Sequence, residues 1–389
     1  MQGMLEGFEA PSTRSADVAR VLVDVDLPHM DRPLDYIVPA GLADAAVVGS
    51  LVRVRLSSAR IDGWIVERTR REVGEGTASI ESVVSSTPVL ASSIYETARR
   101  IAARFLATTS QVLSLAIPPR HARAEREVRD ENAPTWPTVT SDHAGLGWEA
   151  YPAGEALVSR LRAGESPRAI ATMLRPRLRG CLSEAVASTV ASRRSVIVVT
   201  ATGEQAGRYA RALSEDLSIP VSLAGSEVAA EDRYRLHVAA SLGRVPVVVG
   251  TRSAVWVPCS RLGLIVIVDD GDDRLRERRF PKCDALDVAV QRCAVEGSGL
   301  LVVSSARSVK AQALVRSGWA VGIEPTPHAL REATPRVHLH GSTQAEREGA
   351  GGLMRIPQAA LRMIRGGLRS GPVLIQVASA GYWPTVVCR

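Results

Sequence analysis

The stretch that decides the fold is VVVGTRSAVWVPCSRLGLIVIVDD, residues 247–270. It predicts an apolar strand, a polar loop and a second apolar strand that ends in the adjacent carboxylates Asp269 and Asp270. Apolar runs at 195–201 and 300–305 alternate with helical segments, which favours a parallel α/β sheet. Ligands of such sheets lie beyond the carboxyl ends of the strands, so we expect the two acids to face a metal, a phosphate or a nucleic acid.

The composition indicates more than one domain and a polyanionic partner. A chain of 389 residues with 46% hydrophobic content can bury two or three cores. Of its 48 basic residues only Lys282 and Lys310 are lysines, and the formal net charge is +7. Arginine suits phosphate and guanine because its guanidinium donates bidentately. A GC-rich genome would explain the Arg:Lys ratio equally well, but it does not explain the net excess of base over acid.

Cysteine usage and hydropathy predict a soluble cytoplasmic protein. The five cysteines are widely spaced without a CxxC pair, which argues against a disulfide scaffold or a complete zinc site. The first twenty residues hold no apolar core of signal-peptide length. No apolar run approaches the roughly 18 residues that cross a bilayer, so we expect no membrane partner.

Changes in local pattern divide the chain into six segments. Short alternating strands with turn residues between them predict a small all-β module from Val18, followed by a helix at 92–108. A polar stretch broken by proline and glycine follows, and the next segment is helical in pattern with interruptions at Pro167 and Pro176. The predicted segments are a disordered 1–17, a β-rich domain 18–120, a linker 121–150, an α/β domain 151–341, a connection 342–370 and a further element 371–389. The last segment begins with a predicted strand, PVLIQV, at residues 372–377.

Several motifs resemble the primosomal protein N′ (PriA) family, superfamily-2 DNA helicases of replication restart. The most specific is GTRSA-x-x-x-P at Gly250–Pro258, and Leu115–Glu125 is especially similar to actinobacterial members. The resemblance covers roughly residues 18–389 in the family's order. It implies a 3′-end DNA-binding domain at 18–120, a RecA-like first helicase lobe at 151–341 and the start of a second lobe at 371–389. Because the sequence stops at Arg389, we expect the second lobe to be essentially missing.

The resemblance also implies a set of DNA-binding residues. The family's Phe-Asp-Tyr loop, which holds the 3′ end of a strand, matches Leu34-Asp35-Tyr36, and its Pro-Phe-Gly turn matches Arg55-Leu56-Ser57. Asp35 would accept a hydrogen bond from a 3′-hydroxyl. A turn-capping role for Asp35 is the structural alternative. The implied DNA-binding residues are Asp35, Tyr36, Ser57, Arg60, Gly63 and Arg252.

The ATP-handling motifs of the family are altered here. Its Asp-Glu-Glu-His motif matches Asp269-Asp270-Gly271-Asp272, so the water-positioning glutamate is shortened and the ATP-sensing histidine is replaced. No G-x-x-x-x-G-K-[ST] phosphate loop precedes Ser195, and residues 151–194 contain no lysine. The degenerate acidic motif of Asp269, Asp270 and Asp272 therefore leads us to expect no catalytic residue and no bound ATP or magnesium.

We also expect no zinc. Family members carry a cysteine cluster after an Asn-Arg-Arg-Gly-Tyr strand, and residues 377–382 match that strand. Cys388 would then be the first ligand, and a single thiolate cannot replace four.

These observations lead to one functional hypothesis and two alternatives. The hypothesis is a replication-restart protein at the nucleoid that binds forked or single-stranded DNA with a 3′ end, together with primosome and single-stranded DNA-binding proteins, but without helicase activity. The first alternative is an active ATP-dependent 3′–5′ DNA helicase with a divergent nucleotide site. The second is an α/β metabolic enzyme with the β module as a lid, which would need a nucleotide or acid–base constellation that the motifs do not provide.

Overall fold

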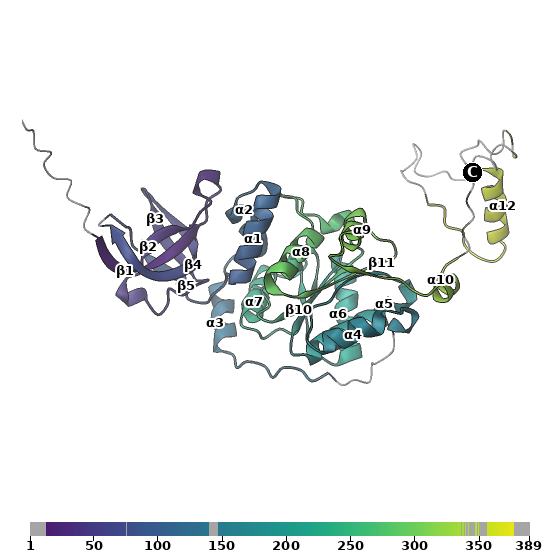
Figure 1. Ribbon diagram of the computed structural model, residues 1–389, viewed down its shortest axis with the longest axis horizontal. Coiled ribbons are helices and arrows are strands. Elements are labelled where there is room, and N and C mark those ends of the chain that lie inside the picture. The colour runs from purple at the N-terminus through teal and green to yellow at the C-terminus, as the bar shows by residue number, and fades with distance from the viewer. Residues whose placement is uncertain are drawn as a thin grey trace, which may run out of the picture. The chain divides into compact units, whose positions relative to one another are not determined.

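The computed structural model (Figure 1) describes residues 13–74, 76–139, 147–335 and 356–376, together with 337, 339, 341, 347 and 349. The chain forms two compact units, residues 1–333 and residues 334–389. The first unit contains an antiparallel sheet and a parallel sheet with its helices. This confirms the predicted combination of a small all-β module with an α/β domain.

The antiparallel sheet has five strands in the order β2-β1-β4-β3-β5. Its inner face follows from alternation: in β3, Val52 and Val54 are buried, whereas Arg53 and Arg55 are exposed. The strand β4 is long enough to pair with both β1 and β3. The strand bounds are Thr13–Val23 (β1), Leu34–Ile37 (β2), Leu51–Leu56 (β3), Ala59–Gly74 (β4) and Ser82–Ser85 (β5).

The expectation that residues 1–17 are disordered is wrong for their last five members. Residues 13–17 belong to β1 and pair with residues 70–74 of β4. The sequence hides this strand because Arg14, Ser15 and Asp17 are polar, and its order comes from backbone hydrogen bonds to a segment more than 50 residues away. Residues 1–12 lie outside the described part of the chain.

Three helices, α1 (Ser92–Phe105), α2 (Thr109–Ala116) and α3 (Ala122–Asp130), follow the antiparallel sheet. The start of α2 is fixed by a capping box, in which the Thr108 side chain accepts from the Gln111 amide and the Gln111 side chain accepts from the Thr108 amide. Helix α3 contradicts the predicted linker 121–150. Its buried residues are Ala124, Glu125 and Val128, and a helix with a buried glutamate carries little apolar signal in its sequence.

The second sheet has seven parallel strands in the order β12-β6-β11-β10-β7-β9-β8. Alternate residues of one strand enter different cores: Ile197 and Val199 of β7 pack on one face, and Val196 and Val198 on the other. Because both faces are covered, the strands read as continuous apolar runs. The bounds are Arg168–Thr172 (β6), Ser195–Val199 (β7), Val221–Ala224 (β8), Val247–Gly250 (β9), Leu262–Val268 (β10), Gly299–Ser304 (β11) and Val321–Ile323 (β12).

Helices cover both faces of the parallel sheet (Figure 1). Helices α7 and α8 share one core with α1, α2 and α3, and helices α4, α5 and α6 share the other. The bounds are Gly154–Arg162 (α4), Leu178–Ala191 (α5), Gly203–Leu217 (α6), Ala230–Ser241 (α7), Ala285–Glu296 (α8), Val309–Arg316 (α9) and Pro327–Ala333 (α10).

The strand β6 corrects the prediction that the stretch between Pro167 and Pro176 is helical. Its sequence, Arg-Ala-Ile-Ala-Thr, has no strong β propensity. It becomes a strand because it pairs with β11 on one side and with β12 on the other. These two pairings are long-range, so neither could be read from the local pattern.

In the second unit, α12 (Gln358–Gly367) lies inside the segment 342–370 that was expected to be a connection. Residues 371–376 are described and form no strand, so the strand expected there is a further correction, and residues 377–389 lie outside the described part. Within the described residues, every helix is too short or too polar to cross a membrane.

The GTRSA segment is held in place by Arg292, which lies on α8 and is fully buried. Its guanidinium donates to the carbonyl oxygens of Val255 and Val257 at 2.6 and 3.0 Å and forms an ion pair with Glu296 at 2.6 Å. Helix α8 therefore fixes the 3-10 turn η6 (Arg252–Trp256) that follows β9.

We expect Arg292→Met to lower the free energy of unfolding by about 3–5 kcal/mol, because it leaves Glu296 buried without its partner. Urea unfolding measures the change. The double variant Arg292→Met, Glu296→Leu removes both charges and should be markedly more stable than the single variant. Equal stability of Arg292→Met and the wild type would contradict this role.

Candidate nucleic-acid interface

The resemblance implied that Asp35 lies in a loop, but the structure places it on strand β2. It stands opposite Arg20 of β1 in the register of the sheet. Its carboxylate forms an ion pair with Arg71, and the Nε atom of Arg20 lies 3.9 Å away. The side chain is 42% exposed, so a ligand can reach it. The strand placement removes the turn-capping alternative and leaves an accessible acceptor between two guanidinium groups.

Tyr36 and Gly63 lie in the interior of the antiparallel module. The Tyr36 side chain is buried, and its hydroxyl donates to the Arg55 carbonyl oxygen at 3.1 Å. Gly63 lies where β4 approaches β1 closely, and a Cβ atom there would be 2.7 Å from the Leu22 carbonyl oxygen. Both residues shape the module from inside, and their implied role in DNA binding stays a prediction.

Ser57 and Arg60 lie at the β3–β4 hairpin. Ser57 is in the two-residue turn with φ of 53°, a backbone conformation that favours glycine. The exposed Arg60 pairs with Glu81 at 2.9 Å, and Arg55 pairs with the same carboxylate. Arg60 thus belongs to a charge cluster around Glu81, separate from the cluster around Asp35.

Helix α7 joins the N-terminal elements to the parallel sheet through buried polar contacts. The carboxylate of Glu125 on α3 accepts hydrogen bonds from Ser85 at 2.7 Å, Arg120 at 2.8 Å and Tyr234 at 2.9 Å. Burial raises the pKa of Glu125, but these three hydrogen bonds together hold it below its usual range. About one helical turn after Tyr234 on α7, the His237 Nε2 atom lies 2.7 Å from the Val89 carbonyl oxygen.

The acidic pair ends β10 at the carboxyl edge of the parallel sheet. Asp269 has a φ of 56°, and its carboxylate accepts from the Arg175 guanidinium at 2.8 Å. Arg175 follows β6, and its Nε atom also donates to the Ser305 hydroxyl at 2.9 Å. The ion-pair partner of the Asp269 carboxylate is therefore Arg175 of the same chain.

The other two acids of this motif have separate partners. Asp270 accepts from the Ser304 hydroxyl at 2.6 Å, and its Oδ2 atom is buried without a hydrogen-bond partner among the described residues. Asp272 pairs with Arg274 at 2.6 Å and caps the short turn η7 (Asp273–Leu275). Arg274 lowers the pKa of Asp272, mainly through their hydrogen bond. Asp272 therefore acts as a local cap.

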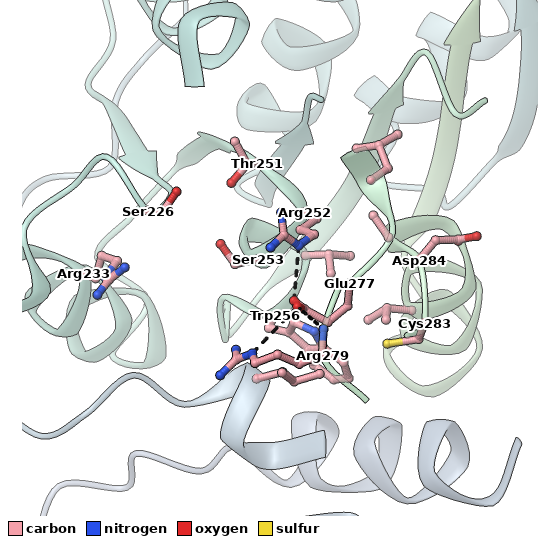
Figure 2. A pocket seen from close by; sticks show the side chains of 15 residues that line it. Ser226, Arg233, Thr251, Arg252, Ser253, Trp256, Glu277, Arg279, Cys283 and Asp284 are labelled. Carbon is pink, nitrogen blue, oxygen red and sulfur yellow. Dashed lines mark hydrogen bonds and ion pairs between the residues drawn. The ribbon is translucent and has the colours of Figure 1, made fainter. Parts of the chain in front are cut away.

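The polar loop after β9 forms one wall of a pocket of about 160 Å³ (Figure 2). Arg252 pairs with Glu277 at 3.2 Å, and Arg279 approaches the same carboxylate at 3.8 Å. Burial raises the pKa of Glu277, but backbone hydrogen bonds from 278 and 279 and the Arg252 side chain hold it below its usual range. Gly250 is required before this loop, since a Cβ atom would lie 1.8 Å from the Ala224 carbonyl oxygen.

Comparison with known proteins gives a match to the N-terminal part of the chain. Residues 20–118 match the family model of the 3′DNA-binding domain (3′BD). The chain is 37% identical to the probable replication restart protein PriA of Mycobacterium tuberculosis (strain ATCC 25618 / H37Rv) and 33% identical to that of Mycobacterium leprae (strain TN), over 94% of its own length in each case. The chain is PriA-like.

The PriA-like chain spans just over half the length of these relatives, 56% and 57% respectively. Among solved structures, that of RecG bound to a three-way DNA junction is similar over 60% of this chain and 29% of the RecG chain, with 14% identity and a TM-score of 0.32.

Sequence reasoning did not identify three residues that lie at these sites of the PriA-like chain. They are Arg175, which pairs with Asp269, and Arg233 and Glu277, which line the pocket. Arg175 carried a weak signal, because it stands in the only segment where a phosphate loop could precede Ser195. Arg233 and Glu277 carried none, since each is one charged residue among many. Cys388 lies outside the described residues, within which no group of three or more His, Cys, Asp or Glu side chains could hold a metal ion.

The His237 contact predicts how stability depends on pH. Burial lowers the pKa of His237 to about 4, outweighing the opposite effect of its hydrogen bond with Val89. The unfolded chain binds the proton first, so stability should be complete above pH ~6.5 and should fall by about 3 kcal/mol as the pH drops to ~4. Urea unfolding across this range should show the loss, and His237→Gln should flatten it. An unchanged slope in the variant would refute the assignment.

Proposed function

We propose that this chain is a replication-restart protein that binds branched replication-fork DNA through the 3′ end of a strand. The observation that carries the proposal is the match of residues 20–118 to the 3′DNA-binding domain. The net charge of +7 and the arginine-rich composition support a nucleic-acid partner. The fork as the preferred form of DNA follows from the resemblance to replication-restart proteins.

Asp35 is the residue that we propose for recognition of the strand end. Its exposed carboxylate can accept a hydrogen bond from a 3′-hydroxyl, and it would repel a 3′-phosphate. Arg20 and Arg71, which flank the carboxylate, can each hold a backbone phosphate of the same strand. This arrangement distinguishes a free end from a continuous strand by charge and not by base sequence.

We expect the wild type to bind forks with a 3′-hydroxyl more tightly than forks with a 3′-phosphate, and Asp35→Ala to lose most of this preference. Fluorescence anisotropy with the two labelled forks measures both affinities. Asp62→Ala is the matched control, because Asp62 is also a strand carboxylate paired with an arginine of the same module. Equal affinity of the wild type for the two ends would reject the proposed recognition.

We further propose that the chain works without ATP hydrolysis. A phosphate loop connects a strand to a helix and points its backbone N–H groups at the phosphates. The connection between β6 and α5 stands in that position, and its sequence Met173-Leu-Arg-Pro-Arg177 contains neither glycine nor lysine.

The first two backbone donors of this connection are already used within the protein. The Met173 amide donates to the Ser304 carbonyl oxygen at 2.8 Å, and the Leu174 amide donates to the Tyr151 hydroxyl at 2.8 Å. Pro176 has no N–H group to donate. Together with the Arg175–Asp269 ion pair, these contacts favour a site that takes neither a triphosphate nor its magnesium ion.

We expect no phosphate release from ATP above a no-protein blank when forked and single-stranded DNA are present. Phosphoryl transfer depends on positioning and on stabilisation of charge, and the described residues at this edge offer little of either. Asp269→Ala is the control for a genuine signal. Release that follows the protein through purification and disappears in Asp269→Ala would overturn the proposal and favour an active helicase.

Primosome proteins and single-stranded DNA-binding protein are the partners that we propose at the fork, and the nucleoid in the cytoplasm is the proposed location. The proposed partners and the proposed location are both based on the replication-restart role alone. In this view the chain marks a branched site for other proteins, and they supply the energy for unwinding.

A further inference from the structure

A cleft of about 540 Å³ opens at the amino edge of the parallel sheet, where β7 and β10 begin. Its walls come from the start of α1, the ends of α7 and α8, and residues 258–261, which lead into β10. Because β10 spans 7 residues, this edge lies about 20 Å from the carboxyl edge that carries Asp269. Neither the acidic motif nor the proposed recognition of a 3′ end uses a residue of this cleft. We call it the amino-edge cleft.

Two arginines line the amino-edge cleft, and neither is paired with a carboxylate of the described residues. The Arg194 guanidinium donates only to neutral acceptors, which are four carbonyl oxygens and the hydroxyl of Ser166. Arg261 is exposed, and its side chain forms no ion pair or hydrogen bond within the described part of the chain. The acid among the lining residues, Glu296, is paired with the buried Arg292 at 2.6 Å. The cleft therefore carries two positive charges that no described acid balances.

The two guanidinium groups also act on each other. Burial and the positive charge of Arg261 both lower the pKa of Arg194, and burial has the larger effect. An anion in the cleft would be attracted by both arginines and would offset their repulsion. Arg261 can hold a phosphate with two N–H groups at once. The hydroxyl groups of Ser93 and Ser260 line the same cleft and can donate further hydrogen bonds.

The lining of the amino-edge cleft suits a phosphate backbone better than unpaired bases or a peptide. None of the described lining residues is aromatic, so the cleft lacks the stacking surface that binds single-stranded nucleic acid. Its larger apolar members, Pro258, Cys259 and Leu262, are buried, which leaves little surface to anchor the apolar side chains of a peptide. Guanidinium and hydroxyl groups are the side chains that typically contact the phosphates of duplex DNA.

We propose that the amino-edge cleft binds the phosphate backbone of a duplex DNA arm through Arg194 and Arg261. The inference rests on the proposed function, because a branched fork joins a strand end to duplex arms. It assigns the amino edge of the parallel sheet to a second part of the fork. The contact depends neither on base sequence nor on a free strand end, since only phosphates are held.

The test uses a labelled DNA duplex with both ends covalently closed, so that no 3′ end and no single strand contributes. Affinities of the full chain are measured by anisotropy between ~50 and ~200 mM salt. Arg261→Gln should weaken binding about three- to tenfold and reduce the steepness of log affinity against log salt by about 0.9, the loss expected for one phosphate contact on duplex DNA. Arg261→Lys keeps the positive charge and should retain the wild-type slope.

Arg211→Gln is the matched control, because Arg211 is also exposed but lies on α6, on the opposite face of the sheet from α7 and α8. An affinity and a slope of Arg261→Gln equal to those of Arg211→Gln would overturn the proposal. If Arg261→Gln instead weakened binding of a labelled poly-glutamate peptide and left duplex binding unchanged, the cleft would be assigned to an acidic protein segment and the proposal would be wrong.

Failure of the amino-edge cleft is distinguishable from failure of the proposed function. In the first case the wild type still prefers a fork with a 3′-hydroxyl, while Arg261→Gln binds the closed duplex as tightly as Arg211→Gln does. In the second case that preference is absent from the wild type itself. Thermal unfolding of Arg261→Gln should match that of the wild type, because the exposed side chain makes no contact with the described residues that its loss would break.

Discussion

The parallel pairing of β6 with β11 determines what stands at the functional edge of the sheet. Register places Thr172 beside Ser304, and the Met173 amide continues the ladder to the Ser304 carbonyl oxygen. The connection from β6 to α5 then brings Arg175 to Asp269 at the end of β10. An open α/β sheet usually presents ligand-binding groups at this edge. Here the groups after β6 form hydrogen bonds and one ion pair within the chain itself.

The strands that the sequence predicted are those with continuous apolar runs, such as Val247–Gly250 and Leu262–Val268. Burial on both faces of a parallel sheet selects for such runs, so local composition is sufficient to find them. The strand β6 and the helix α3 were not predicted because their order depends on distant partners. A five-residue strand with two alanines needs β11 and β12, and a helix with a buried Glu125 needs Tyr234 and Ser85.

The candidate site was predictable in its residue types but not in its pairings. The sequence located Asp35 and the acidic end of β10, because both stand in recognisable motifs. It could not assign Arg71 to Asp35 or Arg175 to Asp269, since these pairs are separated by 36 and 94 residues. Strand register brings the first pair together, and the connection between β6 and α5 brings the second pair together. The ion-pair partner of each carboxylate could therefore be identified only from the structure.

The arginines that can bind a ligand differ from those that stabilise the fold in whether their guanidinium groups already have partners. A net charge of +7 predicts a polyanion but no position for it. Arg292 is satisfied by two carbonyl oxygens and Glu296, and Arg175 by Asp269 and Ser305. These guanidinium groups have no capacity to hold a phosphate without losing a structural contact. Arg233 has that capacity, because none of the described residues forms an ion pair or a hydrogen bond with its side chain.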